Sequence, residues 1–253
     1  MILYEDNDLI VCHKAAGIPV QSARLGQKDM ISILNNYLAQ KGESGGAIRV
    51  VHRLDQPVEG VMVFAKTKQA ASFLSGKIAE GSVKKTYQAV CCVTEKAGKY
   101  LDSEAETSYT LVDYLVKNGK TNTSSVADKN SRDAKRAELS FRVLGTCGWE
   151  AVSGKQEEGT GTDSDRKYLL AEIDLKTGRH HQIRVQMAGA GLPLYGDRKY
   201  NESWEKYLTE EDSKKNTVMT ALCAVSLTFP HPRTKMWKTF RIQPEAGIFH
   251  KFS

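Results

Sequence analysis

The stretch VVHRLDQPVEGVMVFAK, residues 50–66, joins a polar turn to a continuous apolar run. The turn carries His52, Arg53 and Asp55, and a proline closes it before the apolar residues begin. A short apolar run bounded by Pro and Gly is typical of a buried β-strand, so we predict a strand over residues 61–65. Polar side chains at the end of a buried strand cap it, form a turn or react with a ligand. The rest of the chain has to decide among these roles.

Outward from this strand, the pattern predicts many strands and few helices. Apolar or alternating segments predict further strands over residues 2–4, 9–13, 83–93, 107–116, 137–144, 168–175, 222–229 and 237–242. Helical spacing of apolar residues predicts helices over residues 29–39, 68–79 and 179–189, with Thr67 as the N-cap of the second. The polar segments 117–135 and 154–166 are expected to be mobile loops. Together these elements predict an α+β fold, a single domain with a mixed, mainly antiparallel β-sheet flanked by helices.

Composition places the chain among globular proteins of the cytoplasm. It has 253 residues, 40% of them hydrophobic, which is enough for a substantial core. Its 36 Lys and Arg residues exceed its 30 Asp and Glu residues, and the net charge of +6 is compatible with a polyanionic partner without requiring one. The five cysteines include no C-x-x-C pair, which argues against a disulfide framework and a zinc site. We see no signal peptide and no apolar run of membrane-spanning length, so we expect a soluble cytoplasmic protein.

A second polar cluster, TGRHHQIRVQ at residues 177–186, favours a functional role for Asp55 over a purely structural one. Taken alone, Asp55 is explained as a turn cap, a role that many aspartates play. If the second cluster is helical, His181 and Arg184 lie three residues apart and share a face, while their apolar neighbours enter the core. A partly buried guanidinium needs a carboxylate partner, and Asp55 is a candidate for Arg184. A solvated basic helix face remains the alternative for the first basic residues of the cluster.

The same residues raise the question of a metal site. His52, Asp55, His180 and His181 offer imidazole and carboxylate ligands. Their spacing matches no strong zinc pattern, the two adjacent histidines are expected to point in different directions, and the nearby arginines would repel a cation. We therefore predict that no metal is bound. There is also no G-x-G-x-x-G or P-loop motif that would indicate a nucleotide cofactor.

These segments, with three others, resemble the RluA-type pseudouridine synthases. Residues 50–67 resemble that family's H-R-L-D-x-x-T-S-G signature. Residues 177–200, TGRHHQIRVQMAGAGLPLYGDRKY, resemble its G-R-x-H-Q-I-R-V block and the G-D-x-x-Y that follows. Residues 2–20, 84–90 (KKTYQAV) and 221–232 (ALCAVSLTFPHP) are similar to its opening hairpin, its tyrosine strand and its final H-P block. The matches occur in the family's order over nearly the whole chain.

The resemblance implies an RNA isomerase that detaches uracil from C1′ of a uridine, turns it and reattaches it through C5. It implies rRNA or tRNA as the partner and neither metal nor cofactor. At the matching positions, Asp55 would be the catalytic carboxylate, Tyr87 would stack on the target uracil, and Arg184 would pair with Asp55. Arg53 would enter the RNA stack where the base leaves. Further RNA contacts are predicted for His52, Arg179 and His181.

Three positions depart from the family pattern. Val58 and Glu59 replace a Thr-Ser pair, and the added carboxylate is expected to alter substrate contacts without removing activity. Ala15 replaces the proline of K-P-A-G, which is expected to loosen a turn. Cys223 replaces the histidine of L-H-A, which we interpret as a change of packing.

The family pattern begins at residue 2, so we predict one catalytic domain over residues 1–253, without an N-terminal RNA-binding domain of the S4 type and acting as a monomer. RNA selection would then depend on residues 117–135, 154–166 or the basic segment 233–238. Three hypotheses remain: a pseudouridine synthase, a catalytically silent RNA-binding relative, and a metal-dependent phosphoesterase that a chelator would inactivate. The retained trio of Asp55, Tyr87 and Arg184 favours the first, because binding alone does not require a paired carboxylate.

Overall fold

A computed structural model of the chain describes residues 1–24, 26–43, 47–101, 107–153, 166–209, 213 and 218–252. The chain divides into two compact units. Unit 1 consists of Met1–Thr86 and Cys223–Pro244, and unit 2 consists of Tyr87–Leu222 and Glu245–Ser253. The chain passes from unit 1 to unit 2 within one strand and returns within another, so each unit combines segments that are distant in the sequence.

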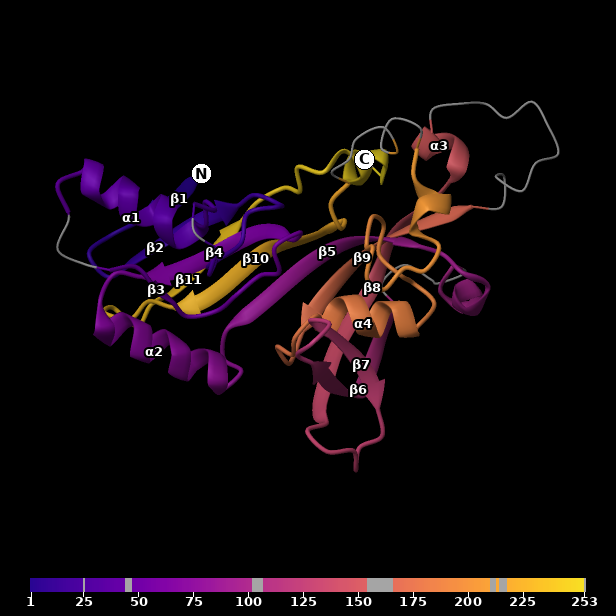
Figure 1. Ribbon diagram of the computed structural model, residues 1–253, viewed down its shortest axis with the longest axis horizontal. Helices are drawn as coiled ribbons and strands as arrows, with labels where there is room; N and C mark the ends of the chain where they lie inside the picture. The colour runs from indigo at the N-terminus through magenta and orange to yellow at the C-terminus, as the bar shows by residue number, and fades with distance from the viewer. Residues whose placement is uncertain are drawn as a thin grey trace. The chain divides into compact units, whose positions relative to one another are not determined.

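Unit 1 is built on a mixed β-sheet with two helices (Figure 1). Its strands are β1 (Ile2–Glu5), β2 (Leu9–Lys14), β3 (Arg49–Val50), β4 (Glu59–Ala65), β10 (Leu222–Pro230) and β11 (Trp237–Arg241). The order is β1-β2-β4-β10, with β3 also paired to β4 and β11 to β10. Strands β4 and β10 run parallel, and the other pairs are antiparallel. Helices α1 (Met30–Gln40) and α2 (Lys68–Ala79) lie on opposite sides of this sheet.

The core of unit 1 explains its apolar sequence runs. Strands β2 and β4 are buried along their whole length, because a helix covers each face of the sheet. On the α2 side, Leu74 packs in one cluster with Val11 of β2 and Val63 of β4. The N-cap predicted for α2 is confirmed, since Thr67 accepts a hydrogen bond from the Ala70 amide at 3.1 Å.

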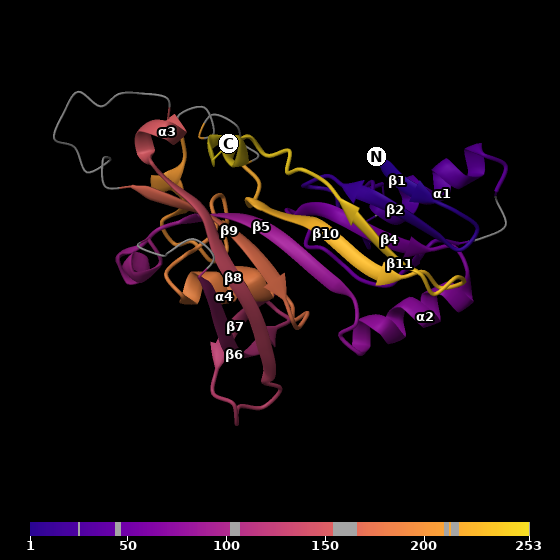
Figure 2. The same cartoon turned by 180° about the vertical axis from the view of Figure 1, so that it is seen from behind.

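Unit 2 consists of five further strands with short helices. Its strands are β5 (Lys84–Cys92), β6 (Ser108–Asn118), β7 (Thr123–Ala127), β8 (Lys135–Gly148) and β9 (Lys167–Leu175), in the order β5-β9-β8-β6-β7. Its helices are α3 (Trp149–Ser153), α4 (Gln182–Gly189) and the 3₁₀ turns η1 (Glu95–Tyr100), η2 (Trp204–Tyr207) and η3 (Gly247–Phe252). Figures 1 and 2 show α4 against one face of the sheet, where Val185 packs with Leu115 of β6 and Ala137 of β8.

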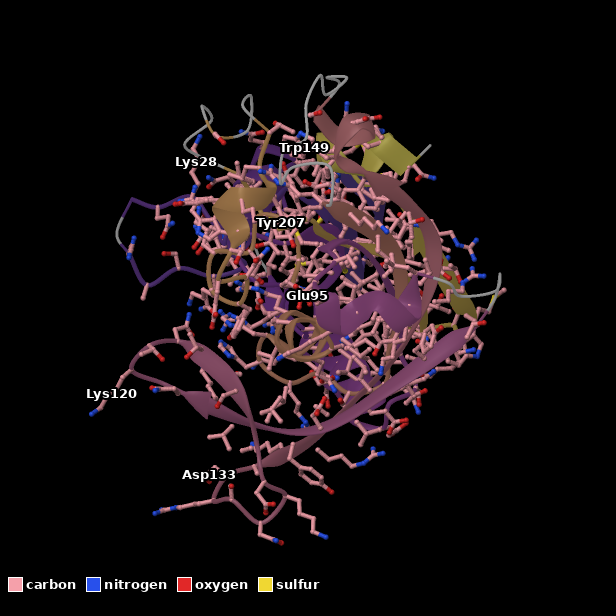
Figure 3. All side chains as sticks on the ribbon, turned by 90° about the vertical axis from the view of Figure 1, so that its right-hand side faces the viewer. Lys28, Glu95, Lys120, Asp133, Trp149 and Tyr207 are labelled. Atoms are coloured by element: carbon pink, nitrogen blue, oxygen red, sulfur yellow. The ribbon has the colours of Figure 1, made fainter. Side chains whose placement is uncertain are left out.

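The predicted fold class is confirmed: the structure is a mixed, mainly antiparallel sheet with few helices. One expectation is wrong, because β7 lies inside segment 117–135, which we expected to be a loop. Strand β7 pairs with β6 in a hairpin, and the turns on either side carry Lys120 and Asp133 outward (Figure 3). The second predicted loop, residues 154–166, lies outside the described residues except for its last position. No helix in the described part of the chain is long and apolar enough to cross a bilayer.

Gly60 sets the close contact between β4 and β10, the parallel pair of unit 1. Its φ is +146°, and a Cβ at this position would lie 2.4 Å from Ala224 Cβ and 2.6 Å from the Ala224 backbone nitrogen. We expect Gly60→Ala to force β10 away from β4 and to lower the free energy of unfolding by about 2–3 kcal/mol. Thermal unfolding followed by circular dichroism measures this loss.

Gly42→Ala is the matched control for Gly60→Ala. Gly42 also has a left-handed backbone, with φ of +79°, but a Cβ there would meet no atom within 4 Å. Its substitution isolates the backbone strain, about 1 kcal/mol, from the clash. Equal losses of stability in the two variants would contradict the predicted crowding at Gly60.

Candidate active site

The turn that carries Asp55 precedes β4 in unit 1. The Val58 amide donates a hydrogen bond to the Asp55 carbonyl at 3.1 Å, which closes the turn around Pro57. Leu54 is buried, whereas Asp55 is half-buried and Arg53 is exposed. Alternate side chains of this segment therefore face the interior and the surface, and a carboxylate lies at the boundary with an arginine beside it.

A buried lysine holds this turn in place through backbone carbonyls. Lys14 is fully buried, and its ammonium donates hydrogen bonds to the carbonyls of Ala15 at 3.1 Å, Ile18 at 2.8 Å and Gln56 at 3.2 Å. Gln56 is also joined to Gly17 by two hydrogen bonds, at 2.8 and 3.0 Å. The K-A-A-G loop, which the missing proline was expected to loosen, is thus tied to the turn that carries Asp55.

Charge as well as geometry connects this lysine to the site. Burial lowers the pKa of Lys14 to about 8, while the nearby carboxylates of Asp55 and Glu59 act in the opposite direction. Glu59 itself is buried, with its Oε2 3.6 Å from Nε2 of His13. The buried Lys14 ammonium partly offsets the negative charges of Asp55 and Glu59 near the turn.

His52, for which the sequence predicts an RNA contact, is buried behind the turn. Its ring is buried, and Nε2 accepts a hydrogen bond from the Val63 amide at 3.1 Å. Burial, reinforced by Lys85, lowers the pKa of His52 to about 3, so the ring is neutral at physiological pH. A neutral, buried ring bonded to β4 supports the turn, and this geometry gives no support to a direct RNA contact.

In unit 2, Arg184 forms a buried ion pair with a carboxylate that the sequence interpretation did not assign to it. The guanidinium donates from Nε to Asp197 Oδ2 at 2.7 Å and from Nη2 to Asp197 Oδ1 at 2.6 Å. Arg184 is 4% exposed and Asp197 is fully buried, and Oδ1 also accepts the backbone amide of Lys199 at 2.9 Å. This two-point geometry fixes the plane of the guanidinium.

The two adjacent histidines lie together at the start of α4, which corrects two expectations. Their rings stack with centroids 3.7 Å apart, although they were expected to point in different directions. His181 has φ of +53°, so the regular helix begins at Gln182 and not at the predicted residue 179. His180 lies 2.9 Å from the Ser124 hydroxyl, which joins this turn to β7.

Tyr200 connects His181 to Arg184. Its hydroxyl lies 2.7 Å from Nδ1 of His181, and its ring lies under the Arg184 guanidinium at 5.0 Å. Burial, followed by the charge of Arg184, lowers the pKa of His181 to about 3. His181 is therefore neutral at physiological pH and adds no charge for binding a phosphate, so its predicted RNA contact would have to be uncharged.

Two buried glutamines hold α4 on the sheet. Gln182 accepts hydrogen bonds from the Thr177 hydroxyl at 2.8 Å and the Arg179 amide at 2.9 Å, and it donates to Gln186 at 3.0 Å. Gln186 in turn donates to Asp113 of β6 at 2.7 Å. Arg179 itself is exposed at this end of the network, which is compatible with its predicted contact to RNA.

Tyr87 is the first residue of unit 2 and lies in β5, as the sequence predicts, with 6% of its surface exposed. Asp55 and Arg53 belong to unit 1, whereas Tyr87 and Arg184 belong to unit 2. The predicted pair of Asp55 with Arg184 and the role of Tyr87 therefore stay predictions. Sequence reasoning missed Asp197, although it is the aspartate of the G-D-x-x-Y match.

One cluster within unit 1 has side chains of the metal-ligand type. Asp6, Asp8 and His231 bring their ligand atoms within 4.8 Å of one another. However, His231 Nε2 lies 2.6 Å from Asp6, and Arg233 binds both oxygens of Asp8 at 2.7 and 3.0 Å. The cluster joins the β1–β2 turn to the β10–β11 turn as a network of ion pairs, and it includes none of the predicted site residues.

Comparison with known proteins supports one family. Residues 8–189 match the sequence model of the family described as RNA pseudouridylate synthase. The tRNA pseudouridine synthase C of Vibrio cholerae is 29% identical over 92% of this chain and 86% of that protein. The ribosomal large subunit pseudouridine synthase D of Neisseria meningitidis is 31% identical over the full chain and 60% of that protein. The solved structure of human RNA pseudouridylate synthase domain containing 4 has a TM-score of 0.71 and 22% identity, covering 99% of this chain and 90% of that one.

Proposed function

Because the chain belongs to the RNA pseudouridylate synthase family, whose members are isomerases, we propose that it converts specific uridines of tRNA or rRNA to pseudouridine. The observation that carries this proposal is the match over residues 8–189, which includes Asp55, Tyr87 and Arg184. We propose that residues 1–253 act as one catalytic domain, as a monomer in the cytoplasm and without a metal.

In the proposed mechanism, the target uridine leaves its stack and its uracil packs on Tyr87. Extrusion of a base from folded RNA costs a few kcal/mol, which stacking on an aromatic ring offsets. The carboxylate of Asp55 acts on the uridine, as nucleophile toward the sugar or the base or as base toward the sugar. The C1′–N1 bond breaks, uracil rotates, and C5 bonds to C1′; the proton displaced from C5 ends on N1, so atoms balance.

Arg184 is proposed to hold Asp55 in its ionised form. Asp197 engages Nε and Nη2 of Arg184, which fixes the plane of the guanidinium. Asp197 and Tyr200 would then orient the guanidinium before RNA binds, so that its position costs little at the moment of reaction. Asp197 is a positioning residue in this scheme.

The experiment that tests the function maps pseudouridine in cellular RNA. RNA from a strain lacking the gene is compared with RNA from the parent, and the purified protein is then added to the RNA of the deletion strain. Loss of one or a few sites, restored by the protein, supports the proposal. An unchanged map together with no turnover on this RNA contradicts it. The tRNA fraction comes first, because the chain spans 86% of the tRNA relative and 60% of the rRNA relative.

Arg53 has a testable role as the side chain that enters the RNA stack. It is exposed next to Asp55, where an arginine can fill the space that a departing base leaves. We expect Arg53→Ala to lower the rate on structured RNA by about ten- to a hundredfold, which corresponds to a few kcal/mol of unstacking.

The control for Arg53→Ala is an unstructured oligonucleotide with the same target uridine. Its base is already unstacked, so the variant and the wild type should turn it over at similar rates in single-turnover assays. An equal loss on both substrates would assign Arg53 to chemistry or to phosphate binding instead of base extrusion.

A further inference from the structure

The β10–β11 hairpin of unit 1 is positively charged, and its exposed face carries an aromatic ring and a cation. Trp237 is 57% exposed, and its neighbour Met236 is 69% exposed. Single apolar side chains on a surface are common and need no explanation. What distinguishes Trp237 is the chemistry of the residues that share its face and its turn.

The side chains of β11 alternate between an exposed face and a half-buried face. Trp237, Thr239 and Arg241 are exposed, whereas Lys238 and Phe240 between them are half-buried. Phe240 packs on Tyr4 with ring centroids 5.5 Å apart, which fixes the inner face of the strand. The outer face therefore presents an indole, a hydroxyl and a guanidinium in a row, separated by about 6.8 Å at each step.

The charge of this hairpin is positive. Residues 231–243 include Arg233, Lys235, Lys238 and Arg241 and no Asp or Glu. Arg233 is paired with Asp8, but Lys235 lies 3.8 Å from the centroid of the Phe73 ring, and Lys238 lies 4.5 Å from that of Tyr4. Aromatic rings hold these ammonium groups in place without neutralising them, so the surface suits a polyanion.

The hairpin also leads away from the candidate active site within the same unit. Strand β10 begins beside β4, where Cys223 pairs with Glu59, four residues after Asp55. Along β11, Arg241 pairs with Ser226 and Trp237 pairs with Pro230, so Arg241 lies at the end of the hairpin nearer this start. A strand of RNA that leaves Asp55 along β10 would meet Arg241 first and Trp237 last.

We propose that an unpaired RNA segment flanking the target uridine binds along this face, with a base stacked on Trp237 and a phosphate held by Arg241. An aromatic platform on a positively charged surface is the arrangement by which proteins bind single-stranded nucleic acid with little sequence preference. The inference rests on the proposed function, since it takes RNA as the substrate. It adds a contact outside the site of chemistry that selects substrates with a single-stranded flank.

Fluorescence of Trp237 tests the contact directly. The chain has three tryptophans, so Trp149→Phe combined with Trp204→Phe leaves Trp237 as the sole reporter. The probe is an oligouridylate of about 12 nucleotides, within the range of single-stranded binding sites. We expect saturable quenching that weakens with salt, and little quenching by an RNA duplex of the same length. A matched variant with Trp204→Phe and Trp237→Phe, which reports from Trp149, should show no comparable change.

Kinetics separate this inference from the proposed function. On the substrate RNA, Trp237→Ala should raise KM by about ten- to a hundredfold with kcat unchanged, and Trp237→Phe should recover part of the loss. Arg241→Gln should reduce the slope of log K against log salt by about one. Lys41→Gln is the matched control, because Lys41 is a surface cation of unit 1 already paired with Glu5 at 2.9 Å.

Each outcome decides between the claims. An active wild type whose KM is insensitive to Trp237→Ala overturns the flanking-RNA site and leaves the isomerase intact. An inactive wild type on all cellular RNA overturns the proposed function, even if Trp237 is quenched by oligouridylate. A dimer in sedimentation that Trp237→Ala dissociates without RNA would assign this face to protein–protein contact and overturn the inference.

Discussion

Asp55→Asn is expected to abolish uridine isomerisation while RNA binding persists. The amide has nearly the shape of the carboxylate but lacks its charge and its nucleophilicity, so the rate should fall by about 10⁴-fold or more. The turn should survive, because its closing hydrogen bond joins the Val58 amide to the backbone carbonyl of Asp55 and does not use the side chain. Tritium release from C5 of labelled uridine measures turnover, and filter binding measures affinity.

The control for Asp55→Asn applies the same change to an aspartate on the surface. Asp174 is exposed, and its side chain accepts a local hydrogen bond from the Lys176 ammonium. Asp174→Asn should keep turnover within about twofold, consistent with a surface substitution away from special features. If Asp55→Asn retained full activity, the carboxylate would have no role in the chemistry, and the assignment of Asp55 would be wrong.

Local patterns in the sequence were enough to place the turn and its strand. The residues after Asp55 form a continuous apolar run because both faces of β4 are covered, so every position of the strand is buried. Helix α2 was predicted from Lys68 to Ala79, because Thr67 provides the cap and the apolar residues recur at helical spacing. In both cases, the residue types of the segment itself carry the signal, as a continuous apolar run in β4 and as a cap with helical spacing in α2.

Strand β7 shows where that reasoning fails. Its sequence, TSSVA, has no alternation of apolar and polar residues, since at this edge of the sheet only Ser124 of its five residues is buried. Strand β7 pairs with β6 so that Leu115 lies opposite Val126. The Tyr200 hydroxyl also holds β7, because it accepts a hydrogen bond from the Ser124 amide at 2.8 Å. These contacts depend on the tertiary fold, which propensity does not encode.

The sequence also did not predict which groups pair with the buried charges of Arg184 and Lys14. Residue types indicated that Arg184 requires a carboxylate, but they did not discriminate Asp55 from Asp197, because both are aspartates within a family motif. The sequence predicts no structural role for Lys14, since lysine is seldom fully buried. Its burial depends on three carbonyls, and one of them, that of Gln56, is 42 residues away in the sequence.

Asp197→Asn is expected to be the most destabilising polar substitution that we predict. It removes the charge that compensates a guanidinium only 4% exposed, and loss of one partner from a buried pair typically costs about 3–5 kcal/mol. The penalty arises because Arg184 keeps its charge while it loses the anion that offset its desolvation. Urea unfolding followed by circular dichroism measures the free energy of unfolding. We also expect slower turnover, because the guanidinium is no longer held in one plane.

A second, exposed ion pair provides the matched comparison for Asp197. Arg142 and Glu172 face each other across β8 and β9 at 2.8 Å, with side chains that are 45% and 29% exposed. Glu172→Gln should cost no more than about 1 kcal/mol, because water screens and replaces the pair. The double variant Arg184→Met with Asp197→Leu should be more stable than Asp197→Asn alone, since it removes the buried charge together with its partner. Equal effects of Asp197→Asn and Glu172→Gln would mean that the Arg184 charge is compensated elsewhere, and the positioning role assigned to Asp197 would then fail.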